Sequence, residues 1–217
     1  PKMRIVPSAM LSSAFLSPNG HDRQKREGRD KRGVPCQNNP AMRQLLLLRH
    51  AKSAWDDPAL ADHARPLNGR GRRAAAAMAN AMRGLGLSPD VVLVSSARRT
   101  LQTLEALSPL PDSPIIEPMD ELYLASWQNL LALLHRVPET ARSVLLIGHN
   151  PGLHDLALAL TGADAMARNP DARRMAEAFP TAALAEFSVS SPWASLAEGG
   201  GRLVRFMIPA DLPEMAA

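Results

Sequence analysis

Short, continuous apolar runs that alternate with longer helical patterns are the feature that most restricts how this chain can fold. Residues 45–48, 91–94 and 144–147 are strand-length runs of Leu, Val and Ile without intervening polar residues. Such runs are typical of strands that are covered on both faces, as in parallel sheets. Because helical patterns separate them, we expect an α/β fold with three α/β/α layers and a mostly parallel central sheet.

The other elements are predicted from apolar spacing and from end signals. Trp127, Leu130, Leu131 and Leu134 stand at i, i+3, i+4 and i+7, which predicts a helix with one buried face. We also expect helices at 72–83, 97–107 and 152–160, a short strand at 115–116, and a closing pair of strands at 182–189 and 202–208 around a turn at 199–201. Residues 50–68 have the composition of a loop, and 162–180 are too polar to assign.

The first 41 residues differ from the rest of the chain in charge and composition. They hold 8 Lys and Arg against 3 Asp and Glu, whereas residues 42–217 hold 17 against 18. The segment also contains several prolines and has too little apolar surface to offset the entropy lost on ordering it. We expect 1–41 to be a disordered basic tail, 42–217 to be one folded domain, and Met42 to be the natural start.

Composition argues against several classes of function. A nearly neutral body does not suit binding to nucleic-acid phosphates, which requires a basic face on the folded part. Cys36 is the only cysteine, so an internal disulfide and a cysteine-based zinc site are both excluded, and the histidines lack the spacing of a metal site. No apolar run is long enough to cross a membrane, and Pro7 interrupts the one segment similar to a secretory signal. We expect a cytoplasmic protein without cofactor, nucleic-acid or membrane partners.

Basic and imidazole side chains follow three of the predicted strands. Arg49 and His50 follow the first, Arg98 and Arg99 the second, and His149 the third. The carboxyl ends of parallel strands face one crevice, so these side chains converge if the strands are neighbours. Guanidinium groups match phosphoryl oxygens in bidentate fashion, and this set therefore predicts a phosphate pocket.

A histidine in such a pocket can also react. Neighbouring cations lower the pKa of His50, which leaves a neutral ring nitrogen able to attack phosphorus at pH 7. The charge of the transition state spreads over three equatorial oxygens, and Arg49, Arg99 and a donor from His149 would surround them. This scheme requires no metal ion.

Four segments carry a resemblance to a known family. Residues 49–55 (Arg-His-Ala-Lys-Ser-Ala-Trp) are similar to the Arg-His-Gly signature of the histidine phosphatase superfamily. Residues 67–71 resemble its Leu-Thr-x-x-Gly helix entry, 95–103 its Ser-Pro-x-x-Arg-Ala-x-Gln-Thr segment, and 148–151 its second histidine motif. The four occur in family order at strand ends, and the resemblance covers residues 42 to about 210.

The short chain, the Arg-His-Ala start, and residues 65–67 and 120–122 are most similar to the SixA-type phosphohistidine phosphatases. This resemblance implies a phosphoglycerate mutase-like fold in which His50 is phosphorylated and Arg49 and Arg99 clamp phosphate, with His149 as the second phosphate-binding histidine. Alignment with Arg-x-x-Gln-Thr selects Arg99 over Arg98. Ser53 is a further candidate for substrate binding. Glu121 is by its position a candidate general acid, and the alternative is that it braces its loop.

This chain departs from the family pattern at three positions. Ala51 replaces the usual glycine, so a torsion that only glycine tolerates is not assumed there. Ser96 replaces a proline, and Asp56 stands where many relatives have asparagine. A carboxylate that faces phosphate would repel it, so we expect Asp56 to point away.

Several other residues have simpler interpretations. His63, His135 and His154 lack a partner pattern and are expected on the surface or in the core, with His154 the nearest to a rim position. Trp55 and Trp193 either wall the cleft or pack, and packing is the commoner use of such rings. The basic segment 168–174 is interpreted as a solvated loop, with contact to an acidic partner as the alternative.

These observations predict a metal-independent phosphatase that works through a covalent phosphohistidine. About 50 residues separate the second strand from that of His149, which leaves no room for a large lid. An open pocket suits a phosphohistidine on a protein, whose imidazole leaves without a strong general acid. The alternatives are a small-molecule phosphomonoesterase, a mutase, and a phosphate-binding module without catalysis.

Overall fold

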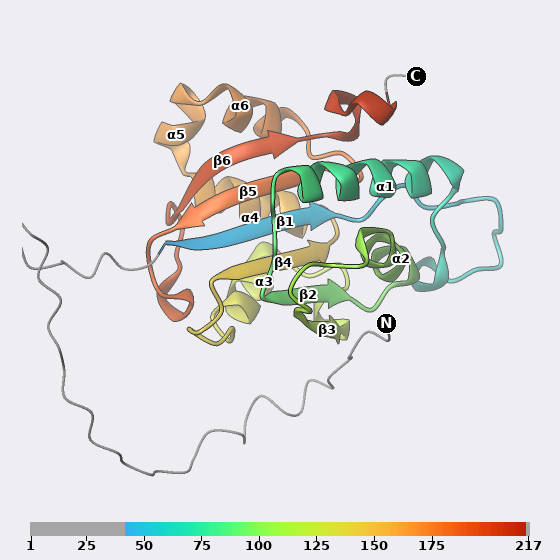
Figure 1. The fold of residues 1–217 in the computed structure, drawn as a ribbon, viewed down its shortest axis with the longest axis horizontal. Coiled ribbons are helices and arrows are strands. Elements are labelled where there is room, and N and C mark those ends of the chain that lie inside the picture. The colour runs from blue at the N-terminus through green and yellow to red at the C-terminus, as the bar shows by residue number, and fades with distance from the viewer. Residues whose placement is uncertain (1–41, 216–217) are drawn as a thin grey trace, which may run out of the picture.

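The central sheet confirms the predicted α/β class. A computed structural model of the protein describes residues 42–215. The sheet has the strand order β3-β2-β4-β1-β5-β6 (Figure 1). Its strands are β1 (Arg43–Arg49), β2 (Val91–Ser95), β3 (Ile115–Met119), β4 (Ser143–Gly148), β5 (Leu184–Val189) and β6 (Gly201–Met207). Strands β1 to β4 are parallel to one another, whereas β5 is antiparallel to both β1 and β6.

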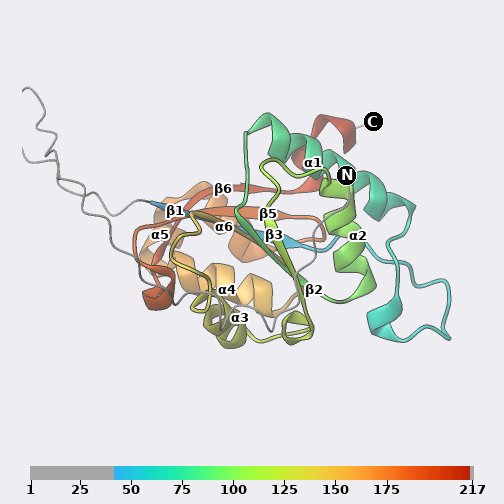
Figure 2. The same ribbon diagram turned by 60° about the horizontal axis from the view of Figure 1, so that its bottom comes forward.

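Helices cover both faces of this sheet. They are α1 (Gly69–Gly84), α2 (Arg98–Leu107), α3 (Trp127–Leu134), α4 (Gly152–Thr161), α5 (Ala163–Arg168) and α6 (Pro170–Glu177). Helices α1 and α2 lie together on one face, and α3, α4 and α6 lie on the other (Figure 2). The result is the three-layer arrangement that the alternating pattern predicts.

Strand β1 shows why the apolar runs are continuous. Leu45 and Leu47 pack in the core on the side of α3 and α4, and Leu46 and Leu48 pack on the side of α1 and α2. All four are fully buried, because successive side chains of a strand point to opposite faces and both faces are covered. Burial of a leucine contributes about 1.5–3 kcal/mol, so β1 is held firmly at the centre of the sheet.

Helix α1 begins three residues before the predicted start. The side chain of Asn68 accepts a hydrogen bond from the Gly71 amide at 2.8 Å and caps the helix. A β-carbon on Gly71 would lie 2.1 Å from the carbonyl oxygen of Lys52, so only glycine allows this contact. The cap and the contact fix the segment that follows β1 against the start of α1.

The segment 162–180, which sequence patterns leave unassigned, contains two short helices, so the interpretation of 168–174 as a loop is wrong. Asn169 caps α6 through its side chain, and Pro170 occupies the first helical position. Helix α6 buries only Ala172 and Met175, which explains why its apolar pattern is weak. The predicted closing pair of strands is present and antiparallel, but β5 begins at Leu184, after Ala182 with a positive φ of 62°.

Two expectations concern the ends and the environment of the chain. The tail assigned to residues 1–41 lies outside the described residues. None of the helices within 42–215 has the length and apolar character that crossing a lipid bilayer requires.

Candidate active site

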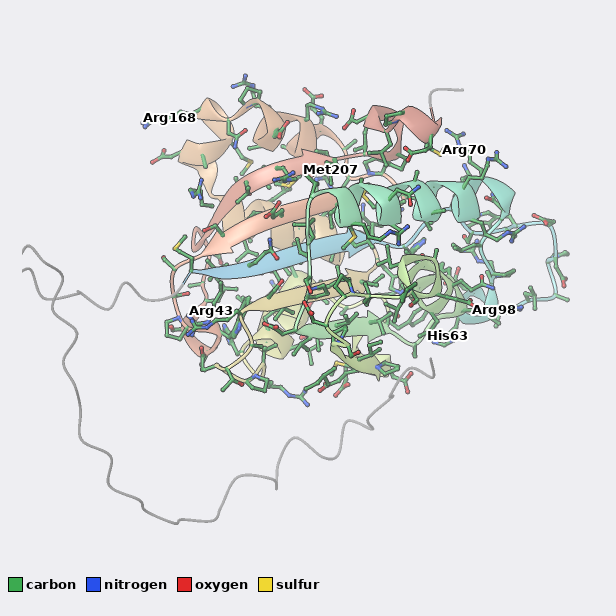
Figure 3. The ribbon with its side chains drawn as sticks, in the orientation of Figure 1. Arg43, His63, Arg70, Arg98, Arg168 and Met207 are labelled. Carbon is green, nitrogen blue, oxygen red and sulfur yellow. The ribbon has the colours of Figure 1, made fainter. Side chains whose placement is uncertain are left out.

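A cavity of about 390 Å³ lies where β1, β2 and β4 end. His63 and Arg98, at this end of the molecule, lie far from Arg43 at the other end (Figure 3). The cavity is lined by Arg49, His50, Lys52, Ser53, Trp55, Asp62, Arg65, Arg99, Leu124, His149, Asn150 and Thr181. The structure thus brings together Arg49, His50, Arg99 and His149, which the sequence places on three separate strand exits.

The backbone of His50 is tied to the neighbouring strand. Its amide donates to the carbonyl of Gly148 at 3.1 Å, so the exits of β1 and β4 lie side by side. The amide of Ala182 donates to the carbonyls of Arg49 and His50 at 3.2 and 3.1 Å. Ala51 is fully buried, and its φ is negative, so alanine serves where relatives carry glycine.

The hydrogen bonds of His50 define its tautomer. Nδ1 lies 2.8 Å from the carbonyl oxygen of Ala51, which can only accept, so Nδ1 carries the proton. Nε2 lies 3.3 Å from Nε of Arg99, which can only donate, so Nε2 keeps its lone pair. Burial, together with the charges of Arg99, Arg49 and Arg65, lowers the pKa of His50 to about 4 against the opposing effect of the bond to Ala51. The ring is neutral at pH 7.

His149 is held in the opposite tautomer. Nη2 of Arg99 donates to its Nδ1 at 3.3 Å, and Nε2 lies 2.8 Å from Oγ of Ser95, to which it donates. Burial, followed by the proximity of His50 and Arg99, lowers its pKa to about 3. The ring centroids of His149 and His50 are 5.0 Å apart, so two neutral imidazoles share the cavity wall.

Arg99 connects the two histidines. It is almost fully buried at the start of α2, whereas Arg98 is exposed. Nη1 donates to the carbonyl of Asp62 at 2.6 Å, and Nη2 pairs with its carboxylate at 3.0 Å. These bonds leave the guanidinium in one orientation, with Nε directed at His50.

Arg49 has a different set of partners. Nη1 donates to the carbonyl of Phe179 at 2.8 Å, and no carboxylate of the described residues forms an ion pair with it. Its buried Nε has no partner within 42–215. Burial, and then the charge of Arg99, lowers its pKa. An anion in the cavity would supply the negative charge that Arg49 lacks.

Asp62 is a cavity residue that sequence reasoning missed. It lies in a short 3-10 helix, Asp62–Ala64, within the segment predicted as a loop. Its carboxylate accepts from Tyr123 Oη at 2.5 Å, from Arg65 Nη2 at 2.7 Å and from Arg99 Nη2 at 3.0 Å. The bond from Tyr123, followed by those from Arg65 and Arg99, holds the pKa of Asp62 well below its usual range. Its partners Arg99 and Tyr123 are 37 and 61 residues away, so no local spacing signals this contact.

The remaining candidates are divided between the cavity and other places. Ser53 is buried in the cavity wall, where its Oγ accepts from Arg65 at 3.0 Å. The structure does not bring Glu121 to the cavity, because its carboxylate pairs with Arg136 at 3.6 Å. Asp56 is also outside the lining and accepts a hydrogen bond from the amide of Trp55.

Of the other aromatic and histidine candidates, Trp55 alone lines the cavity. Trp193 is fully buried in the core, and Trp55 lines the cavity. His63 hydrogen-bonds Ser96, His135 bonds the carbonyl of Leu196, and His154 bonds that of Met175, all outside the lining. Within 42–215 no three His, Cys, Asp or Glu side chains form a group that could hold a metal ion.

Sequence comparisons identify relatives along most of the chain. A sequence model described as "Histidine phosphatase superfamily (branch 1)" matches residues 45–150. An uncharacterised protein of Mycobacterium tuberculosis is 36% identical over 165 residues, 75% of this chain and 99% of the relative. An uncharacterised chloroplastic protein of Arabidopsis thaliana is 32% identical over 179 residues, 77% of this chain and 78% of the relative.

Solved structures with the same fold include SixA proteins. A proposed phosphohistidine phosphatase SixA of Nakamurella multipartitia is 34% identical with a TM-score of 0.68, over 77% of this chain and 96% of the other. A protein histidine phosphatase SixA complexed with tungstate is 29% identical with a TM-score of 0.62, over 77% and 98%. The chain therefore belongs to the histidine phosphatase superfamily, as a phosphatase of the SixA-like group.

Proposed function

We propose that this phosphatase removes the phosphoryl group from phosphohistidine on proteins, through a covalent intermediate on His50. The observation that carries the proposal is the lone pair of His50 Nε2 beside the Nε of Arg99, in a cavity with four cationic side chains. A neutral imidazole is a nucleophile at pH 7, and guanidinium donors stabilise the charge on the transferring group.

In the first step, Nε2 of His50 attacks phosphorus and forms a new P–N bond. The P–N bond to the substrate imidazole breaks, and the electron pair goes to the released ring. Arg49 and Arg99 hold the equatorial oxygens, as guanidinium clamps do in phosphoryl transfer. The neutral ring of His149 supplies a further donor through the Nε2 hydrogen, which otherwise points to Oγ of Ser95, so this step needs no additional proton.

The leaving group explains why phosphohistidine suits this site. A substrate imidazole that is protonated on its other nitrogen leaves as a neutral ring and needs no acid. An alkoxide leaving group needs a proton from the enzyme, and general acid catalysis contributes about 10²- to 10⁴-fold. Asp62 is the one carboxylate among the described cavity residues, and its low pKa keeps it ionised.

In the second step, water attacks the phosphorylated His50. A P–O bond forms, the P–N bond breaks, and Nε2 regains its lone pair. Both protons of the water remain on the phosphate product, so atoms and charge balance without another reactant. Hydrolysis of phosphohistidine to histidine and phosphate is the net reaction.

The comparisons support the class of ligand. One SixA relative is complexed with tungstate, a tetrahedral oxyanion with the shape of phosphate. A small phosphomonoester is the second candidate substrate, because the cavity is large enough for one. The absence of a protonated acid among the described lining residues favours the P–N substrate.

The test compares three substrates and two histidine variants. His50→Ala should abolish phosphate release from a phosphohistidine peptide and from phosphoramidate, and mass spectrometry should find a quenched phosphoryl adduct on the His50 peptide of the wild type alone. His135→Ala, outside the cavity, should behave like the wild type. We expect a preference of about 100-fold or more for the P–N substrate over a phosphomonoester. Turnover that survives in His50→Ala would refute the mechanism, and a preference for the ester would refute the substrate.

A further inference from the structure

The mouth of the cavity carries two unusually exposed apolar side chains. Trp55 is 73% exposed and Leu124 is 53% exposed, the highest values among large apolar residues within 42–215. Both line the cavity. They come from different parts of the sheet edge, Trp55 from the segment after β1 and Leu124 from the segment after β3. Exposed apolar surface beside a polar site is typical of a place where a ligand or partner binds.

Trp55 is held as a rigid platform. The guanidinium carbon of Arg65 lies 3.4 Å from the centroid of its ring, a cation–π contact on one face. Arg65 is itself buried and fixed by Ser53 Oγ and by the carboxylate of Asp62. Because Arg65 occupies one face and the residue is largely exposed, the other face of the indole is open to solvent.

Leu124 is held in a conformation that leucine rarely adopts. Its φ is +49°, in the left-handed region that disfavours residues with a β-carbon. The residues on both sides are fixed, because Tyr123 bonds Asp62 and Ala125 is packed in the core. Such strain persists only when the surroundings enforce it, and it is concentrated at functional sites. Here the strained residue presents an apolar side chain at the cavity mouth.

We infer that Trp55 and Leu124 form a second subsite, which binds the leaving group while the phosphoryl group occupies the cationic cavity. The subsite takes the imidazole ring of the phosphorylated residue against the open face of Trp55, and an apolar group of the flanking peptide against Leu124. Aromatic stacking of this kind requires a flat leaving group, which a phosphohistidine has and a sugar phosphate lacks. The inference rests on the proposed function and assigns to it the residues that recognise the substrate.

A simpler role for Trp55 makes a different prediction. If the indole only braces Arg65, its removal disturbs the phosphate cavity and lowers turnover of every substrate. If the indole binds the leaving ring, its removal affects only substrates that have a ring. Phosphoramidate has the same P–N bond as phosphohistidine and no ring, so the pair separates the two roles.

The experiment measures kcat/KM of the full chain and its variants on a phosphohistidine peptide and on phosphoramidate. Trp55→Ala should lower the value for the peptide about 3- to 10-fold, mainly through KM, and change that for phosphoramidate less than about 2-fold. Trp55→Phe should recover most of the loss, and Leu124→Ala should lower the peptide value about 3-fold. Leu85→Ala, at the end of α1 and outside the cavity, is the matched control for an exposed apolar residue.

The outcomes separate this inference from the proposed function. An equal loss on both substrates in Trp55→Ala, or no loss on either, overturns the subsite. A wild-type enzyme that hydrolyses phosphoramidate but not the phosphohistidine peptide overturns the proposed substrate, and the subsite with it. That failure is visible in the wild type, whereas failure of the subsite alone is visible only in the ratio between variants.

Discussion

Arg43 and Arg49 occupy opposite ends of the same strand and serve opposite purposes. Arg43 begins β1, where Nη2 pairs with Glu139 at 2.6 Å and Nη1 donates to the carbonyl of Ser191 at 3.1 Å. Arg49 ends β1 in the cavity, where it has no carboxylate partner among the described residues. The first charge is neutralised by the fold itself, and the second is left for a ligand.

The difference extends to the surroundings of each arginine. The cavity contains the cations Arg49, Lys52, Arg65 and Arg99, against Asp62 as the one carboxylate of its described lining. The parallel strands bring basic residues together at this site, because the carboxyl ends of all these strands lie on the same side of the sheet. The nearly neutral composition of residues 42–217 hides it, so charge placement and not net charge indicates function here.

Substitution of the two arginines should give the largest contrast. Arg49→Ala is expected to lower kcat/KM on phosphoramidate about 10²- to 10³-fold, because it removes a fixed donor to the transferring group. Arg43→Ala should leave kcat/KM within about 2-fold, because its partners lie at the far end of the sheet. Steady-state kinetics on both purified variants provides the check. Similar losses in both would show that the two ends of β1 are not functionally distinct.

The neutral histidines of the cavity should make stability depend on pH. An unfolded histidine titrates near pH 6.5, whereas folded His50 and His149 have pKa values of about 4 and about 3. Between these values the unfolded chain binds protons that the folded chain excludes, so stability falls as the pH drops below 6.5. Each ring should contribute about 2 kcal/mol of loss between pH 7 and pH 5.

Urea unfolding at the two pH values measures this loss. His149→Gln should lose about 2 kcal/mol less than the wild type over the same interval, because glutamine does not titrate. His135→Gln serves as the control, since His135 lies outside the cavity. An unchanged loss in His149→Gln would mean that the ring is already protonated in the folded protein.

Asp62→Asn tests whether the carboxylate of Asp62 positions the arginines of the cavity. The carboxylate orients Arg65 and Arg99, so its loss should reduce kcat about 10-fold, by analogy with residues that orient catalytic groups elsewhere. The same change removes a negative charge from the cavity wall, so inorganic phosphate should inhibit at equal or lower concentration. Inhibition constants measured beside kcat test both effects. A loss of phosphate affinity without a change in kcat would contradict the positioning role.

The contrast between strand ends and loops also explains what sequence could predict. Residues 45–48, 91–94 and 144–147 lie within β1, β2 and β4, because a continuous apolar run of strand length has few other uses in a folded chain. Sequence could predict Arg49, His50 and His149 as site residues because they directly follow the apolar runs of these strands. The family resemblance then selected Arg99, which the structure places in the cavity, over the exposed Arg98.

The conformation of the loops depends on contacts between residues that are distant in sequence. Asp62 reaches the cavity only because its segment folds back onto Arg99 and Tyr123. Glu121, adjacent in sequence to a cavity-facing segment, instead pairs with Arg136 at the end of α3. The predicted start of α1 at residue 72 differs from the observed start at Gly69, because a side-chain contact of Asn68 and not an apolar pattern marks the beginning of this helix. Periodicity identifies elements that pack on a sheet, whereas hydrogen bonds between loops leave no periodic trace.

The smallest expected effect concerns the paired end of β1. Arg43 is buried but Glu139 is 44% exposed, so solvent screens the ion pair, and such pairs contribute about 0.2–1 kcal/mol. A double-mutant cycle with Arg43→Met and Glu139→Gln, followed by urea unfolding, should give a coupling energy in this range that decreases with added salt. Turnover should remain at the wild-type rate in all three variants, since neither residue lines the cavity. Glu139 also accepts from the amide of Ala194 at 3.0 Å, so Glu139→Gln alone should cost more than the coupling energy. A coupling energy above about 3 kcal/mol that does not change with salt would instead indicate that the Arg43–Glu139 pair is fully shielded from solvent. The two ends of β1 would then not differ in how well solvent screens their charges.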